Sequence, residues 1–511
     1  MTPPAADRET HVGVVVLVGD RAYKAKKPLR TAFLDFSTPR RRLDALQREL
    51  DLNRRVAPDV YLGIARLTGP GPAERTADGG EPVLVMRRMP DERRLAERVR
   101  SGADVGGDLR AVARLLAAFH ARAERSAAID ADGGAAALTT RWTANLAELV
   151  PYRGRVLTPE VVDGIGERVH RFLAGRGPLL ADRVAQHRIV DGHGDLIADD
   201  VFCLDDGPRV LDCLEFDDRL RHVDGLDDAA FLAMDLEHLG RPDLAAVFLD
   251  DYAEFSGDPA PTALRHHYVA YRAVVRAKVA CLRHDQGDPG AATDAVAHAA
   301  LALHRLRTGE VRLVLVGGLP GTGKTTLAHG LADRFGAVVL SSDRIRKELA
   351  GLDPESPAAA AFGGGLYRAE HTDRVYAELL RRAQALLARG ESVVLDASWT
   401  AARHRDRADA VARRAAAPLI ALLCSAQQVL ARRRILERTG GPSDATPRSP
   451  TRWPRSPTPG PTRWWCRPRP GRPPRWTGRV RPGRSADGPK VPAGRAARRC
   501  ADRGCDATVE P

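Results

Sequence analysis

The segment 317–326 reads GGLPGTGKTT and contains the spacing Gly-x4-Gly, followed at once by Lys324 and Thr325. Glycines at this spacing let backbone N–H groups surround a phosphate chain, and the N-terminus of a following helix adds a favourable dipole. The Lys324 ammonium would reach the β- and γ-phosphates, and the Thr325 hydroxyl would hold Mg²⁺. The pattern therefore predicts a P-loop that binds ATP or GTP with Mg²⁺. The predicted nucleotide-binding residues are Gly318, Pro320, Gly321, Thr322, Gly323, Lys324, Thr325 and Thr326.

The residues on either side of this loop predict the elements that must position it. Apolar residues dominate 311–316, as in a buried strand, and the apolar positions of 327–332 recur at helical spacing. A P-loop requires this strand–loop–helix context. We therefore expect a separate α/β domain that begins near residue 309.

Two carboxylates follow other predicted strands of the same domain. Asp343 stands where the strand pattern of 338–340 gives way to a helical one, and Asp396 ends the apolar run 393–395. Because the carboxyl ends of parallel strands line one edge of a sheet, we expect Asp396 in the phosphate crevice, acting through a metal-bound water or on the substrate. Asp343 by itself is equally consistent with a helix N-cap.

The densest basic cluster of this domain is Arg432–Arg438, in which Arg434 and Arg438 are one helical turn apart. Arginines on a lid helix stabilise the charge that develops on a transferred phosphoryl group. We therefore treat both as candidate catalytic residues, with an exposed basic helix as the alternative.

A second group of carboxylates lies far from the P-loop, in the segment 193–200 (HGDLIADD) and at Asp212. In protein-kinase-like enzymes the catalytic loop has the form H-x-D-L-x-x-x-N and is followed by a metal-binding Asp. Asp195 fits the role of the base beside the substrate hydroxyl. Asp200 and Asp212 fit the roles of the two Mg²⁺ ligands.

The N-terminal segment offers the remaining parts of such a site. The runs 14–18 and 21–26 are strand-like and are joined by Gly19-Asp20, a typical hairpin turn. The second strand supplies Lys24 or Lys26 as the phosphate-binding lysine, with Lys24 favoured. Glu49, on a predicted helix over 40–55, is the expected ion-pair partner. The order lysine, glutamate, base, metal ligands is that of a kinase fold.

Residues 1–300 resemble the aminoglycoside phosphotransferase-like kinases, whose signature is an HGD loop. Residues 309–446 are similar to P-loop kinases of the polynucleotide-kinase and zeta-toxin type. The fusion looks like a bacterial family described as bifunctional aminoglycoside phosphotransferase/ATP-binding proteins. The likeness is carried by YKAKKP (23–28), FLDFST (33–38), RELDLN (48–53) and DCLEF (212–216).

The resemblance implies an α+β, bilobal protein-kinase-like domain, with a small lobe over about 1–90 and a large lobe over about 91–300. An α/β P-loop domain with a parallel sheet follows, over 309–446. It implies an ATP-dependent kinase that phosphorylates a hydroxyl of a small polar molecule, such as a sugar or aminocyclitol. In the P-loop domain it implies Asp343 as the general base and Arg346 as a residue that binds the substrate.

The sequence departs from the family at the HGD loop. The family has His and Asn where this chain has Ile197 and Asp200, and the first hairpin has no Gly-x-Gly-x-x-Gly loop, only Gly13 and Gly19. An Asp at position 200 can still bind Mg²⁺. The alternative to an active kinase is a kinase-like scaffold that positions a substrate or partner.

The formal net charge of +13 is concentrated in one segment. Residues 448–511 contain 15 Arg and one Lys against three Asp and one Glu, a net charge of +12, which leaves +1 for the first 447 residues. This segment contains no Leu, Ile, Phe or Met, so we expect residues 447–511 to be a disordered tail. A frameshifted translation of a GC-rich gene and an RNA-binding Arg/Trp arm are both consistent with it.

Composition limits the remaining function classes. No apolar run is long enough to span a membrane, residues 1–11 do not have the pattern of a signal peptide, and the seven cysteines lack metal-ligand spacing. We therefore expect a cytoplasmic protein with a small-molecule acceptor, and neither a membrane nor a nucleic acid as partner. No signal of an oligomeric state is present. A nucleic-acid end-kinase and an ATP-binding regulatory or stress protein remain alternatives.

Overall fold

A computed structural model describes residues 13–30, 35–67, 80–353 and 368–437, together with the backbone of the short strands β1 (Ala6–Glu9) and β14 (Asp506–Thr508). The chain forms two compact units. The first contains Met1–Val169 and Leu180–Gly309, and is called the kinase-like unit below. The second contains His170–Leu179 and Glu310–Pro511, and is called the P-loop unit.

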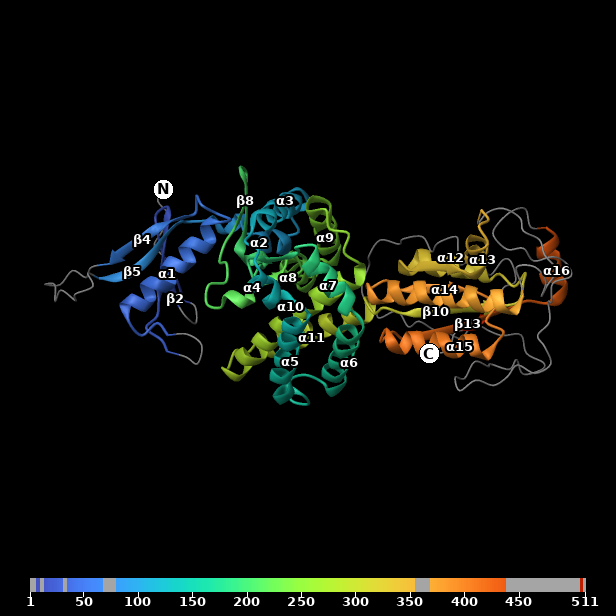
Figure 1. Ribbon diagram of the computed structural model, residues 1–511. Coiled ribbons are helices and arrows are strands. Elements are labelled where there is room, and N and C mark those ends of the chain that lie inside the picture. The colour runs from blue at the N-terminus through green and yellow to red at the C-terminus, as the bar shows by residue number, and fades with distance from the viewer. Residues whose placement is uncertain are drawn as a thin grey trace. The chain divides into compact units, whose positions relative to one another are not determined.

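The kinase-like unit begins with an antiparallel five-stranded sheet in the order β1-β2-β3-β5-β4 (Figure 1). The predicted hairpin is confirmed as β2 and β3, with Gly19 in the left-handed conformation (φ 59°) at its turn. Besides β1, the strands of this sheet are β2 (Gly13–Val18), β3 (Arg21–Lys26), β4 (Tyr61–Leu67) and β5 (Glu81–Arg87).

The predicted helix over 40–55 is α1 (Pro39–Arg54), which packs on this sheet. Its N-cap is Thr38, whose hydroxyl accepts a hydrogen bond from Arg41 N, and Pro39 occupies the first turn, where a missing N–H costs nothing. Leu46 and Leu50 of the helix form a core with Tyr61 and Leu84 of the sheet. This packing fixes the side of α1 that faces β3.

Helices make up most of the rest of the kinase-like unit. Short strands flank the HGD loop: β6 (Ile189–Asp191), β7 (Val201–Leu204), β8 (Gly207–Val210) and β9 (His222–Asp224). The helices of this unit are α2 (Leu95–Arg100), α3 (Gly106–Arg122), α4 (Ala127–Gly133), α5 (Ala135–Leu149), α8 (Gly225–His238), α9 (Pro242–Ser256), α10 (Thr262–Asp285) and α11 (Ala291–Thr308). Two further helices, α6 (Pro159–Gly175) and α7 (Gly177–Ala185), are divided between the units, because His170–Leu179 belongs to the P-loop unit.

The P-loop unit has a sheet in the order β11-β12-β10-β13-β14, in which the first four strands are parallel and β14 is an antiparallel edge strand. Its strands are β10 (Leu313–Gly318), β11 (Val338–Ser341), β12 (Val393–Asp396) and β13 (Leu419–Ser425). Its helices are α12 (Lys324–Phe335), α13 (Ser342–Leu349), α14 (Ala369–Ala388), α15 (Ala402–Arg414) and α16 (Gln428–Leu436).

The predicted fold class is confirmed: an antiparallel sheet with a helical lobe, followed by a parallel α/β P-loop domain. The sequence pattern did not reveal β1 or β4. Of the tail predicted to be disordered, the structure describes only β14, and the rest lies outside the described residues. In the described part of the chain, no helix combines the length and the apolar character needed to cross a bilayer.

Candidate functional site

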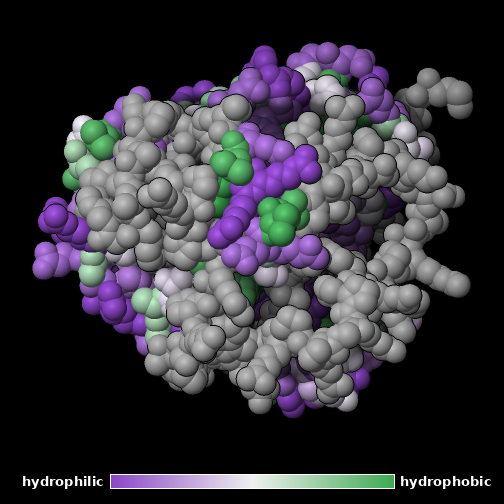
Figure 2. Space-filling view, turned by 90° about the vertical axis from the view of Figure 1, so that its right-hand side faces the viewer, coloured by the Kyte–Doolittle hydropathy of each residue, from purple (hydrophilic) through white to green (hydrophobic). Residues whose placement is uncertain are grey.

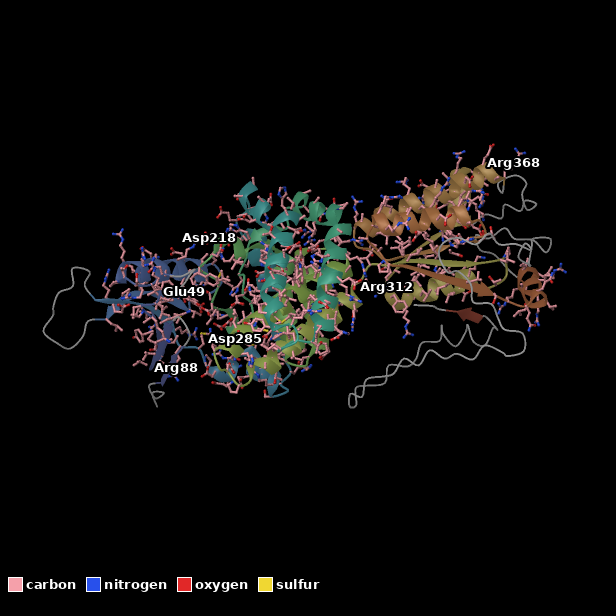
Figure 3. The ribbon with its side chains drawn as sticks, turned by 90° about the horizontal axis from the view of Figure 1, so that it is seen from below. Glu49, Arg88, Asp218, Asp285, Arg312 and Arg368 are labelled. Carbon is pink, nitrogen blue, oxygen red and sulfur yellow. The ribbon has the colours of Figure 1, made fainter. Side chains whose placement is uncertain are left out.

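Lys24 and Lys26 project from the same face of β3, because residues two apart in a strand share a face. Both reach Glu49 on α1, since Lys24 Nζ lies 2.7 Å from Glu49 Oε1 and Lys26 Nζ lies 2.7 Å from Glu49 Oε2. Figure 3 labels Glu49 in the ribbon. The Glu49 side chain is completely buried. One buried carboxylate therefore holds both candidate lysines.

The two lysines differ in their second partner. Lys24 Nζ lies 2.8 Å from Asp212 Oδ1, whereas Lys26 Nζ lies 2.6 Å from Glu215 Oε1. Burial lowers the pKa of Lys24, but Asp212 and Glu49 outweigh burial and raise it well above its ordinary value. The Lys24 charge in turn lowers the pKa of Asp212. The structure thus places Lys24, rather than Lys26, against the carboxylate predicted to bind metal.

The HGD loop follows β6 and is bonded to the segment that carries Asp212. The His193 ring contacts the Leu211 carbonyl (Nε2 to O, 2.9 Å), and Leu214 N donates to His193 O at 3.1 Å. At the end of the loop, Leu211 N donates to Asp200 O at 2.9 Å. These bonds bring the segments of the three predicted carboxylates together.

Asp228, near the N-terminus of α8, orients the start of the loop. It accepts hydrogen bonds from His193 N (2.7 Å) and Gly194 N (2.9 Å), and its Oδ2 lies 3.0 Å from His120 Nε2. Burial would raise the pKa of Asp228, but its hydrogen bond with His120 and its electrostatic interactions with nearby residues, Arg272 among them, lower it below the usual range. Sequence reasoning missed this residue, because acidic side chains in the first turn of a helix are common for their favourable interaction with the helix dipole.

The predicted base, Asp195, lies among charges of both signs. Burial raises its pKa, and the positive charge of Arg276 on α10 lowers it. Arg272, one turn earlier on the same helix, donates to Gly194 O at 3.2 Å and pairs with Asp227. Neither arginine belongs to a motif at a fixed distance from the loop, so the sequence carried no signal for them.

The predicted metal ligand Asp200 is close enough to two other carboxylates to be affected by their charge. Burial raises its pKa well above the ordinary value, and Asp212 and Asp195 raise it further. A divalent cation between Asp200 and Asp212 would relieve this repulsion, so the residues present fit Mg²⁺. In the described part of the chain, no three His, Cys, Asp or Glu side chains are placed to hold a metal by themselves. A shared site, completed by phosphate oxygens, is the usual arrangement for Mg²⁺.

The P-loop has the backbone that its glycines predict. Gly318, Gly321 and Gly323 all have positive φ angles (141°, 78° and 92°), which residues with a Cβ rarely adopt. A Cβ at Gly318 would also lie 2.5 Å from the Cys424 carbonyl oxygen. The loop therefore needs glycine for both its conformation and its close packing on β13.

Lys324 begins α12, and its Nζ donates to Leu319 O at 3.2 Å. Thr325 Oγ1 donates to Asp396 Oδ2 at 2.7 Å, which brings the two predicted metal-binding residues of this unit into direct contact. Of the other predicted residues, Thr322 is buried, Pro320 is half-buried, and Thr326 is exposed on α12. The Thr325 hydroxyl in the first turn of α12 and the Asp396 carboxylate at the end of β12 are ligands that suit Mg²⁺.

Asp343 lies in the first turn of α13, at the carboxyl end of β11. Arg346, on the same helix, is buried, and its Nη1 donates to Thr372 Oγ1 at 3.2 Å. Both residues act electrostatically on Tyr376 of α14, whose hydroxyl lies 3.2 Å from Ser398 Oγ, just after β12. Asp343 and Arg346 therefore both lie within electrostatic range of a tyrosine that sequence reasoning did not identify.

The predicted lid arginine Arg434 is half-buried on α16, and Arg438 lies outside the described residues. α16 packs on the P-loop, since a Cβ at Gly321 would clash with the Ala431 carbonyl. Figure 2 faces the side on which α16 lies in Figure 1, and shows hydrophilic and hydrophobic residues next to one another. On α16, Val429 and Leu436 are exposed beside Arg432 and Arg433, so its surface is mixed rather than uniformly basic.

The fold and these two sites define a protein that joins a kinase-like unit to a P-loop nucleotide-binding unit. The family model for an AAA domain matches residues 313–452. Uncharacterised proteins of Mycobacterium bovis and of two Mycobacterium tuberculosis strains are each 48% identical to the chain over 439 residues, covering 86% of the chain and 87% of each relative. The chain belongs to the same family as these mycobacterial proteins.

Among solved structures, a choline/ethanolamine kinase family protein from Mesorhizobium loti aligns with 60% of this chain and 93% of its own length. The TM-score is 0.37 and the sequence identity is 14%.

Proposed function

We propose that the kinase-like unit, as a module spanning about residues 1–300, transfers the γ-phosphoryl group of ATP to a hydroxyl of a small polar molecule. The observation that carries this proposal is the continuous ion-paired chain from Glu49 through Lys24 to Asp212. A phosphate-binding lysine fixed between a helix glutamate and a metal-binding aspartate is the arrangement that protein kinases require for phosphoryl transfer.

In this proposal Asp195 accepts the proton of the acceptor hydroxyl, and Lys24 orients the phosphates. Asp200 and Asp212 hold Mg²⁺. When bound, Mg²⁺ neutralises charge on the β- and γ-phosphate oxygens. Asp228 keeps the backbone of the HGD loop in place, so that Asp195 meets the acceptor in a fixed geometry.

We propose that the P-loop module, about residues 309–446, is a second kinase site. Lys324 and the glycine-rich backbone bind the phosphates, while Thr325 and Asp396 hold Mg²⁺. Asp343 acts as the general base, and Arg346 binds the acceptor. The half-buried Arg434 stabilises the transferred phosphoryl group.

Phosphoryl transfer from labelled ATP tests both modules. The full-length protein and its Asp195→Asn and Lys324→Ala variants are incubated with a panel of sugars, aminocyclitols, choline and ethanolamine. We expect one product that Asp195→Asn abolishes and Lys324→Ala leaves intact, made by the kinase-like module. A product of the P-loop module should show the reverse pattern, lost in Lys324→Ala and kept in Asp195→Asn. Bound nucleotide without transfer to any acceptor by any form would contradict the proposal and favour a regulatory ATP-binding protein.

A further inference from the structure

Asp212 has a backbone conformation that its residue type disfavours. Its φ angle is 63°, in the left-handed region, where a Cβ crowds the backbone. A residue other than glycine stays in this region only when its surroundings hold it there, and such positions cluster at functional sites.

Two peptide N–H groups, one on each side of the Asp212 Cα, are bound by side chains of the small lobe. Asp212 N donates to the hydroxyl of Tyr61 on β4 at 3.0 Å, and Cys213 N donates to Asn53 Oδ1 on α1 at 2.9 Å. Both acceptor residues are almost completely buried. Asn53 Nδ2 in turn donates to Glu49 O at 2.9 Å, so the amide is oriented by the helix turn that carries Glu49.

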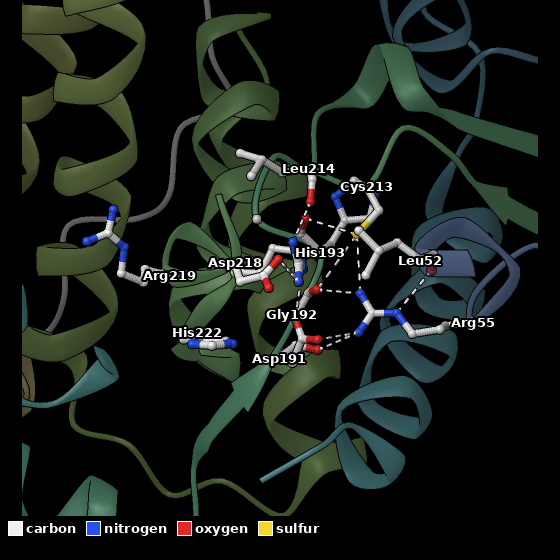
Figure 4. Close-up of polar contacts among 12 residues, drawn as sticks. Leu52, Arg55, Asp191, Gly192, His193, Cys213, Leu214, Asp218, Arg219 and His222 are labelled. Carbon is white, nitrogen blue, oxygen red and sulfur yellow. Dashed lines mark hydrogen bonds and ion pairs between the residues drawn. The ribbon is translucent and has the colours of Figure 1, made fainter. Parts of the chain in front are cut away.

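Arg55, just after α1, binds the same segment from a third direction (Figure 4). Its Nη2 lies 3.3 Å from Cys213 Sγ and donates to Gly192 O at 3.0 Å, and its Nη1 lies 3.0 Å from Asp191 Oδ2. Its Nε donates to Leu52 O at 3.0 Å, which fixes the guanidinium relative to the helix end. Arg55 therefore joins α1, the residue after Asp212 and the entry to the HGD loop.

We propose that Tyr61, Asn53 and Arg55 are positioning residues that hold Asp212 in its left-handed conformation, so that its carboxylate faces Lys24. The inference rests on the proposed function, in which Asp212 is a metal ligand. Asn53 lies on α1, Arg55 follows the end of that helix, and Tyr61 lies on β4. Asp212, in contrast, follows β8. The small lobe thus orients a metal ligand that it does not itself contain.

Groups that orient a metal ligand typically change metal affinity by about 10–100-fold when they are removed. Tyr61→Phe removes one hydroxyl, and Asn53→Leu removes the amide at similar volume. The readout is Mn²⁺ affinity in the presence of a non-hydrolysable ATP analogue, measured by electron paramagnetic resonance. All forms are full-length and carry Lys324→Ala, which silences the P-loop site. Tyr152→Phe is the matched control, because Tyr152 is also buried and its hydroxyl donates to Asp285, outside the site.

We expect Tyr61→Phe and Asn53→Leu each to weaken Mn²⁺ binding by about 10–100-fold, with Tyr152→Phe unchanged. Equal affinity in Tyr61→Phe, Asn53→Leu and the parent, with loss of binding only in Asp212→Asn, would overturn the inference and leave the proposed function standing. A parent that binds no Mn²⁺, or an Asp212→Asn variant that binds as well as the parent, would overturn both. Thermal melting of each variant separates weakened binding from unfolding.

Discussion

The two candidate phosphate-binding lysines have opposite surroundings. Lys324 contacts the carbonyl of Leu319, five residues earlier in the same loop. Lys24 contacts Glu49 on a helix and Asp212, which is 188 residues away. The contact described for Lys324 stays within one loop, whereas Lys24 joins three segments of its unit.

This difference has an energetic consequence. The lysines at Glu49 belong to a buried ion-pair network, so removing one member leaves uncompensated charges away from water. The contact described for the Lys324 side chain is with a backbone carbonyl group, that of Leu319. We therefore expect the kinase-like site to contribute to the stability of its own unit, and the P-loop lysine to act on nucleotide binding alone.

The largest expected effect is on catalysis by the kinase-like unit. Asp195→Asn keeps the side-chain volume but removes the base, so transfer to the acceptor should fall by about 10²–10⁴-fold. Asp205→Asn is the matched control, because Asp205 is an exposed residue that pairs with Arg93. Labelled-ATP transfer measures both. Equal rates for the two variants would show that the HGD loop is not catalytic.

The next effect is on stability. Glu49→Gln removes the shared partner of Lys24 and Lys26 and should destabilise the kinase-like unit by about 3–5 kcal/mol. Denaturant unfolding, followed by a probe in that unit, measures the change. If the variant and the parent had equal free energies of unfolding, the ion pairs at Glu49 would not stabilise the kinase-like unit, and the expected difference in stability between the two sites would be wrong.

Lys324→Ala should have the complementary result. The loss of one charged contact to the phosphates costs about 1.5–3 kcal/mol, or roughly 10–100-fold in nucleotide affinity. The melting temperature should not change. Titration calorimetry and thermal melting, done on the same sample, check both expectations. A large drop in melting temperature would mean that Lys324 contributes to the stability of the fold, as Lys24 is expected to do.

The smallest effect is a shift in pH dependence. Transfer requires ionised Asp195, so activity should rise as pH passes upward through the pKa of that carboxyl group, which burial raises. Arg276 lowers this pKa, as do His193 and Arg272, while Asp212 raises it. Arg276→Gln should therefore move the acidic limb of the pH–rate profile to higher pH. Arg283→Gln, on the same helix but paired with Asp288, should not. A shift toward lower pH in Arg276→Gln would contradict this electrostatic role.

The same contrast explains how much of the molecule could be predicted from the sequence. The P-loop, the hairpin and α1 were predictable, because their signals are local: glycine spacing, a Gly-Asp turn and helical periodicity. The HGD loop was predictable as a motif, although Ile197 and Asp200 depart from the pattern. The sequence could not decide between Lys24 and Lys26 as the phosphate-binding lysine, because the answer depends on which of them contacts Asp212 in the folded chain.

The supporting residues of the kinase-like site could not be predicted for the same reason. Tyr61 and Asn53 each accept one hydrogen bond, and Asp228 accepts two, from backbone N–H groups far along the chain. A tyrosine on a strand or an aspartate in a first helical turn has an ordinary structural explanation, so residue type alone does not mark it. Only the folded backbone shows which N–H groups they bind.

Nucleotide stoichiometry tests the central claim most directly, namely that the chain contains two separate nucleotide sites. Equilibrium dialysis with a labelled non-hydrolysable ATP analogue and Mg²⁺ should give two molecules per chain. That number should fall to one in Lys324→Ala, to one in Asp212→Ala, and to none in the double variant. One molecule per chain, lost in Lys324→Ala and unaffected by Asp212→Ala, would contradict the account.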